Sequence, residues 1–145
     1  MLVKPITYVD YNGVERTETF YFNLTKAELM EMQADYSGSL EEILTKIVEA
    51  KDGPTIMKFV KELIVRSYGV KSLDGRKIVK NDEVLNDFLQ TEAYSELYME
   101  LITDAAACAD FANGIIPKGL VKYVDGANSD TKSEIVTGLD TYGTS

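Results

Sequence analysis

The start of the chain alternates apolar and polar residues with a period of two. Residues 6–24 fall into two such runs, separated by Asn12-Gly13. Asn-Gly between β-rich runs is a strong hairpin signal, because both residues tolerate the positive φ of a type I′ turn. We therefore predict an N-terminal β-hairpin whose second strand carries Phe20, Phe22 and Leu24 on one face.

After residue 25 the apolar positions follow the period of an amphipathic helix. In residues 40–50 the apolar side chains recur at i, i+3, i+4, i+7 and i+8, which is one helical face. Capping-box patterns, in which a Thr or Ser and a Glu three residues later satisfy free backbone N–H groups, begin at Thr25 and Ser39. The predicted helices are 26–34, 40–50, 54–67, Asn81 or Asp82 to about Gln90, 91–102 and 104–113.

The segment between the third and fourth predicted helices carries turn signals. We expect Gly69 to stop the third helix, Asp74-Gly75 to form a turn, and residues 76–80 to form a short strand. We expect the core to form between helices 40–50 and 55–67 through Leu44, Ile47, Phe59 and Leu63.

These elements predict a mainly α fold, with an N-terminal β-hairpin (about 6–24) followed by a five- to six-helix compact domain. Residues 1–117 form one domain in this prediction. Residues 118–145 are rich in Gly, Ser, Thr, Asp and Lys, and we expect an extended tail that is flexible or is ordered by a partner.

Composition narrows the chemistry that the chain can perform. The 145 residues are 45% hydrophobic and include no His and one Cys, Cys108. The commonest general base and metal ligand are therefore absent, and no intrachain disulfide or zinc-binding Cys cluster is possible. No stretch approaches the roughly 20 apolar residues that span a bilayer, and residues 1–5 lack a signal-peptide core. We expect a cytoplasmic protein with no cofactor and no membrane partner.

Charge is distributed unevenly along the chain. The net charge is −9, yet residues 53–80 carry seven Lys or Arg and two Asp or Glu, while residues 81–117 carry eight Asp or Glu and no Lys or Arg. The basic segment is either a nucleic-acid site or a neutralising surface for the acidic helices, within the fold or between copies. We favour neutralisation, and therefore no nucleic-acid partner, because the chain as a whole repels phosphate backbones.

An acidic and aromatic pattern singles out residues 91–102. Glu92, Glu96 and Glu100 lie four residues apart and share a helix face, which we interpret as a solvated face rather than a catalytic or Mg²⁺ site. Tyr94, Tyr98 and Leu101 form an apolar stripe on the same helix. Aromatic surface near like charge suits binding of a basic amphipathic helix, although some of these side chains are equally suited to the core. The chain has no nucleotide-binding glycine motif.

A set of short motifs lies in a fixed order along about residues 6–117. The motifs are the Tyr8–Gly13 hairpin pattern, Phe22–Leu29, Ser67–Gly69, Ser72, Asp74-Gly75, Phe88, Thr91–Tyr94, Glu100-Leu101 and Phe111–Pro117. These motifs carry a resemblance to the tail assembly chaperones of long-tailed bacteriophages of Gram-positive hosts. It implies a mostly helical, non-enzymatic protein that binds the tape-measure protein and keeps it from aggregating until tail-tube subunits polymerise around it. Members of the family are often made in a short and a frameshift-extended form.

Three hypotheses follow for the function. The first is a tail assembly chaperone in the host cytoplasm, which binds the tape-measure protein, with the tail-tube protein as a further partner. We expect it to form homo-oligomers, either through the hairpin or through contact of residues 53–80 with residues 81–117. The second is a virion structural protein, such as a tail or head–tail connector component. The third, an enzyme with a carboxylate site, is the least supported. For the first, the expected partner-binding residues are Tyr94, Glu96, Tyr98, Glu100, Leu101 and Phe111.

Overall fold

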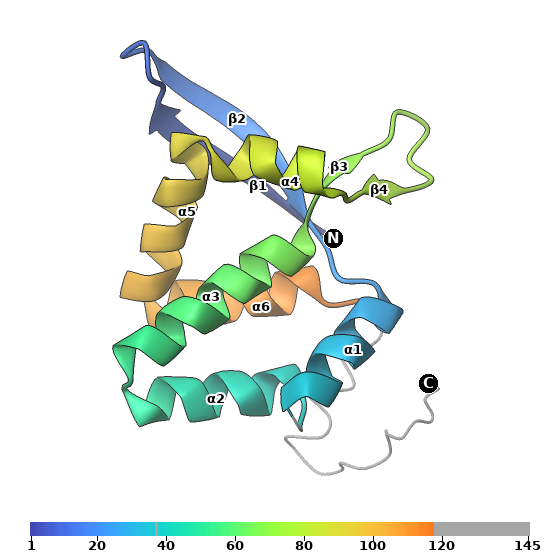
Figure 1. Cartoon of the computed structure of the whole chain (residues 1–145), viewed down its shortest axis with the longest axis vertical. Helices are drawn as coiled ribbons and strands as arrows, with labels where there is room; N and C mark the ends of the chain where they lie inside the picture. Colours follow the sequence, from blue (N-terminus) through green and yellow to red (C-terminus); the bar gives the residue numbers. More distant parts are fainter. Residues whose placement is uncertain (37, 118–145) are drawn as a thin grey trace.

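A computed structural model describes residues 1–36 and 38–117. Four strands and six helices follow one another along these residues (Figure 1). They are β1 (Leu2–Val9), β2 (Glu15–Phe22), α1 (Lys26–Tyr36), α2 (Leu40–Ala50), α3 (Gly53–Ser67), β3 (Tyr68–Lys71), β4 (Ile78–Val79), α4 (Asp82–Leu89), α5 (Glu92–Thr103) and α6 (Ala105–Ile115). The predicted mainly α fold with an N-terminal hairpin is confirmed. The tail predicted at 118–145 lies outside the described residues, and the domain division at residue 117 stays a prediction.

The hairpin is longer than predicted and belongs to a four-stranded antiparallel sheet. The strand order is β1-β2-β3-β4, and β1 pairs with β2 from Leu2 opposite Phe22 to Val9 opposite Glu15. The helices cover one face of this sheet, and the tip of the hairpin extends beyond them (Figure 1). The alternation of side chains places Ile6, Tyr8 and Phe22 on the covered face, where they are buried.

The type I′ turn predicted at Asn12-Gly13 is wrong. Val9 pairs with Glu15, so the loop has five residues, and only Gly13 of this loop has a positive φ, at 81°. The reason lies in Asp10, whose carboxylate accepts hydrogen bonds from the backbone N–H groups of Asn12 and Val14 at 2.9 Å each. Such side-chain bonding favours a longer loop in which Gly13 alone needs the left-handed conformation.

Gly69 does not stop α3, because the chain passes from Ser67 directly into β3. A Cβ atom at Gly69 would lie 2.1 Å from Cγ2 of Ile78 on β4. Gly69 is therefore required by the close approach of β3 and β4. The short strand predicted at 76–80 is present as Ile78–Val79.

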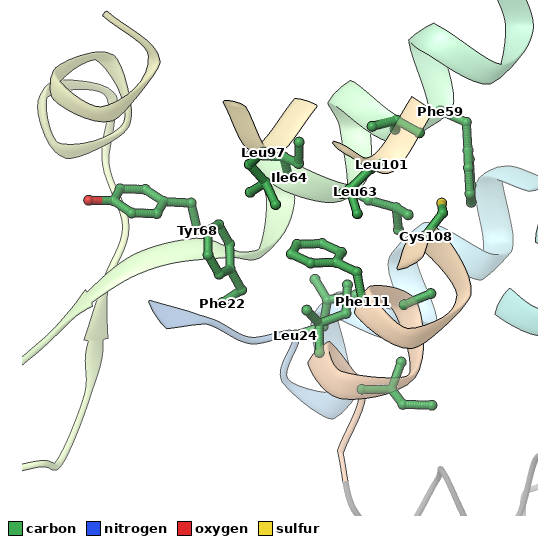
Figure 2. Close-up of a cluster of buried hydrophobic side chains, with 14 of the residues drawn as sticks. Phe22, Leu24, Phe59, Leu63, Ile64, Tyr68, Leu97, Leu101, Cys108 and Phe111 are labelled. Carbon is green, nitrogen blue, oxygen red and sulfur yellow. The ribbon is translucent and has the colours of Figure 1, made fainter. Parts of the chain in front are cut away.

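The core joins the hairpin to the helices. Phe22 of β2 packs edge-on against Phe111 of α6 at 5.2 Å between ring centroids (Figure 2). Tyr68 of β3 stacks on Phe88 of α4, with 4.3 Å between ring centroids. Phe59 and Leu63 of α3 are fully buried, as predicted. The other two predicted core residues, Leu44 and Ile47 of α2, are half-buried at the edge of this core.

Side-chain caps fix several helix starts. Both predicted capping boxes are present. At the start of α1, the side chains of Thr25 and Glu28 each accept a hydrogen bond from the other residue's backbone N–H, and Ser39 and Glu42 do the same at the start of α2. Thr91 caps α5 by accepting a hydrogen bond from the Tyr94 N–H. This cap fixes the start of α5 at Glu92.

Candidate functional site

Three half-buried apolar side chains follow one another along α5. Tyr94, Tyr98 and Ile102 are spaced four residues apart, so they share one side of the helix, and all three pack against the core while keeping some exposed surface. We call them the tyrosine ridge. The rings of Tyr94 and Tyr98 are 5.8 Å apart, and Tyr94 also packs edge-on against Phe88 at 5.9 Å. The ridge is thus a supported aromatic surface, which loses little conformational entropy on binding.

The Tyr94 phenol is a neutral group at physiological pH. Burial raises the pKa of Tyr94 above its ordinary value, and the neighbouring Tyr98 adds to this effect. The ridge therefore offers an apolar ring face together with a hydroxyl that donates and accepts hydrogen bonds.

The predicted acidic residues lie on another side of α5. Successive helical residues are rotated by about 100°, so Glu96 lies about 160° around the axis from Tyr98. Glu100 forms an ion pair with Lys4 of β1 at 3.4 Å, and Glu92 accepts a hydrogen bond from the Tyr11 hydroxyl at 2.8 Å. Glu92 and Glu100 therefore hold the hairpin against α5. Glu96 is exposed and forms no ion pair among the described residues.

Leu101 and Phe111 are placed in the core rather than on the surface. Each is 3% exposed. Figure 2 shows Leu101 among core side chains of α3 and α6, and Phe111 beside Phe22. The stripe expected from Tyr94, Tyr98 and Leu101 is therefore divided by the fold, because Leu101 faces inward while the tyrosines flank the buried side of α5.

An apolar pocket that the sequence did not predict lies at the end of the ridge. The pocket has a volume of about 210 Å³ and lies between α2, α3, the last turn of α5 and the first turn of α6. Its lining includes Ile47, Val48, Ile56, Ile102 and Cys108. Ile102 belongs to both the ridge and the pocket, so the two form one continuous apolar track.

The track holds no group suited to covalent or metal chemistry. Burial raises the pKa of the Cys108 thiol above its ordinary value, and Cys108 is 4% exposed, so little reactive thiolate forms. Among residues 1–36 and 38–117, no cluster of His, Cys, Asp or Glu has the arrangement of a metal site. No helix within these residues is long and apolar enough to cross a bilayer.

Comparison with known proteins identifies the family. A family model described as phage tail assembly chaperone matches residues 1–139. No curated protein and no solved structure gives a significant match. The matched range covers every described element and continues past Pro117.

Proposed function

Because the chain belongs to the phage tail assembly chaperone family, we propose that it binds the tape-measure protein through the track formed by the tyrosine ridge and the apolar pocket. In this proposal it keeps that partner soluble in the host cytoplasm while the tail assembles. The observation that carries the proposal is the continuity of the track at Ile102, which gives one helix of a partner both an aromatic surface and an apolar recess.

The shape of the track supports a helical ligand. Tyr94, Tyr98 and Ile102 present contacts at a four-residue spacing, which matches the spacing of side chains along one face of a bound helix. The pocket then accepts one larger apolar side chain. Aromatic residues at the centre of an interface typically cost about 2 kcal/mol or more on truncation, so the two tyrosines are the expected energetic centre.

The acidic residues contribute by attraction at a distance in this proposal. Glu96 and Glu100 lie away from the ridge, so they steer a basic partner rather than contact the same helix. The eight acidic residues of 81–117 raise the association rate for such a partner, and this effect weakens with salt. The tail-tube protein is a further proposed partner of this acidic surface.

The test is co-expression of the tape-measure protein with the wild-type chain and with Tyr94→Ala/Tyr98→Ala. We expect the partner to be soluble with the wild type and to aggregate with the double variant. Leu73→Ala is the control, because Leu73 is fully exposed in the loop between β3 and β4, outside the ridge. Circular dichroism must first show that each variant is folded, since Tyr94 also contacts Phe88.

Two outcomes would contradict the proposal. If the double variant keeps the partner as soluble as the wild type does, the ridge is not the binding surface. If the wild-type chain never binds the tape-measure protein and mass spectrometry finds the chain in purified mature particles, the virion structural hypothesis replaces the chaperone hypothesis.

A further inference from the structure

A second pocket lies between α2 and α6, beside the point where the chain leaves α6. It has a volume of about 140 Å³, and its lining includes Leu40, Glu41, Ala109, Asn113 and Ile116. Leu44 lines both this pocket and the apolar pocket at the end of the ridge. The two pockets thus form one groove along α2 and α6, the α2–α6 groove, which runs from Ile116 to Ala105.

One polar atom in this groove has no partner. The Oε1 atom of Glu41 is shielded from solvent and makes no hydrogen bond with a described residue. A carboxylate oxygen that is withdrawn from water without a donor is costly, so it favours a cationic or N–H group in the adjacent pocket. The groove therefore favours a mainly apolar ligand whose positive charge lies near the Ile116 end of the groove.

The chain itself supplies a segment of this composition. Residues 118–124 read Lys-Gly-Leu-Val-Lys-Tyr-Val, which places a lysine first and four apolar residues close behind it. Lys118 directly follows Pro117, and Ile116 already lines the groove. We propose that residues 118–124 bind in the α2–α6 groove of the same molecule, with the Lys118 ammonium paired with Glu41 and the apolar residues covering the remainder.

The lengths are compatible with this arrangement. From Ile116 back to Ala105 the helix axis spans about 16 Å at 1.5 Å per residue. An extended segment advances about 3.3 Å per residue, so about five residues cover that distance. Residues 120–124, after a turn that Gly119 permits, therefore reach from the Ile116 end to the Ala105 end. A tape-measure helix entering the apolar pocket displaces Val124, a consequence that, unlike the binding of the segment, rests on the proposed function.

A nitroxide label on the full-length chain tests the position of the segment. The label is attached at Asp125→Cys in a Cys108→Ala background, and paramagnetic broadening is read from backbone amide NMR signals. If the segment binds, the label lies at the Ala105 end and the amides of Leu44, Ile47 and Ala105 lose intensity most. If it does not bind, residue 125 remains tethered through Pro117, the Ile115 and Ile116 amides lose most, and the proposal is overturned. A label at Thr141→Cys is the matched control and should give no preference for Ala105.

Charge exchange and a second measurement make the test specific. Glu41→Lys should abolish the broadening at Ala105, and adding Lys118→Glu should restore it. Broadening that does not respond to either change would contradict the proposed ion pair.

Hydrogen exchange provides a readout without a label. The α2 and α6 amides should exchange faster in full-length Leu120→Asp/Val121→Asp than in the wild type, and equal rates would refute the proposal. Broadening of an isotope-labelled chain by a nitroxide on a different chain would assign the groove to a neighbour's segment instead.

Discussion

At the scale of single residues, Lys80 joins three separate parts of the chain. Its ammonium donates to the backbone oxygens of Asn23 at 2.7 Å and Arg66 at 2.9 Å, and to the Glu28 carboxylate at 2.8 Å. The side chain is 22% exposed, so these bonds are partly shielded from water. A single ammonium group therefore satisfies hydrogen-bond acceptors at three places: just after β2, in the last turn of α3 and in the first turn of α1.

Lys80→Met should destabilise the protein, because it leaves these acceptors without their donor. Each buried group left unsatisfied costs about 1–3 kcal/mol, so we expect a loss in that range from the free energy of unfolding, measured by urea denaturation. Lys77→Met, at an exposed position in the same segment, is the control and should change stability by less than about 0.5 kcal/mol. Equal midpoints for the two variants would show that Lys80 has no structural role.

The same contact predicts a pH dependence. Burial raises the pKa of Glu28, but hydrogen bonds from Lys80 and Thr25 outweigh it and hold the pKa below the ordinary value of 4.5. A carboxyl whose pKa is lower in the folded state contributes stability above its ordinary pKa and loses that contribution as pH falls through the folded value. We therefore expect the stability of the wild type to decrease more between about pH 7 and about pH 3 than that of Lys80→Met.

Urea midpoints across that range measure the difference between the two proteins. The carboxyls of Asp10 and Asp74 also have lowered pKa values, set mainly by Arg16 for the first and by the Arg76 backbone N–H for the second. Neither contact changes in the variant, so the comparison isolates Glu28. Parallel curves for wild type and variant would contradict the assignment.

At the scale of elements, the sheet depends on the close approach of β3 and β4. Gly69→Ala places a methyl group 2.1 Å from Cγ2 of Ile78 and 3.1 Å from the Val79 carbonyl oxygen. Overpacking of this kind costs about 1–3 kcal/mol, and thermal unfolding should show it as a lowered Tm. Gly53→Ala is the control, because a Cβ there meets nothing within 4 Å. A Tm for Gly69→Ala equal to that of Gly53→Ala would mean that β4 moves aside freely.

The elements differ in how far the sequence predicts them. The six helices follow from apolar periods and caps that are local, so their order and most of their ends are as predicted. β3 and β4 have only four and two residues, too few to show a period of two. The hairpin loop was mispredicted because the Asp10 side chain, rather than Asn12-Gly13 alone, determines the turn.

The candidate site shows the same division on a single helix. The apolar side of α5 is broad and includes Leu97, Leu101, Tyr94, Tyr98 and Ile102. Periodicity identifies this arc, but only packing against α3 and α6 decides that the leucines are buried and that the tyrosines keep exposed surface. The pocket beside Ile102 is formed by four helices, so no local pattern predicts it.

At the scale of the whole molecule, opposite charges remain separated along the chain. The ion pairs of residues 53–80 join Arg66 to Asp35 and Glu62, Lys80 to Glu28, and Arg76 to Asp74. Within the described part of the chain, none of them reaches the acidic residues of 81–117, whose one ion pair is with Lys4. Inside the described fold, the basic segment therefore does not neutralise the acidic helices through ion pairs. The remaining hypothesis is that the two segments neutralise each other between copies of the chain.

We predict that the chain self-associates through its basic segment and the acidic segment of a neighbouring copy. Lys58 and Lys61 on α3 are exposed and form no ion pair among the described residues, as is also true of Glu96 on α5. Screening shortens the reach of such charges from about 10 Å at 0.1 M salt to about 3 Å at 1 M, so the association should weaken as salt rises.

Sedimentation velocity should show a larger mean mass at low salt. Lys58→Glu/Lys61→Glu should reduce it, whereas Lys26→Glu/Lys46→Glu, which changes the net charge equally outside the basic segment, should reduce it less. A monomer at low salt and high concentration would contradict this contact, and equal effects of the two double variants would attribute association to net charge rather than to the basic segment.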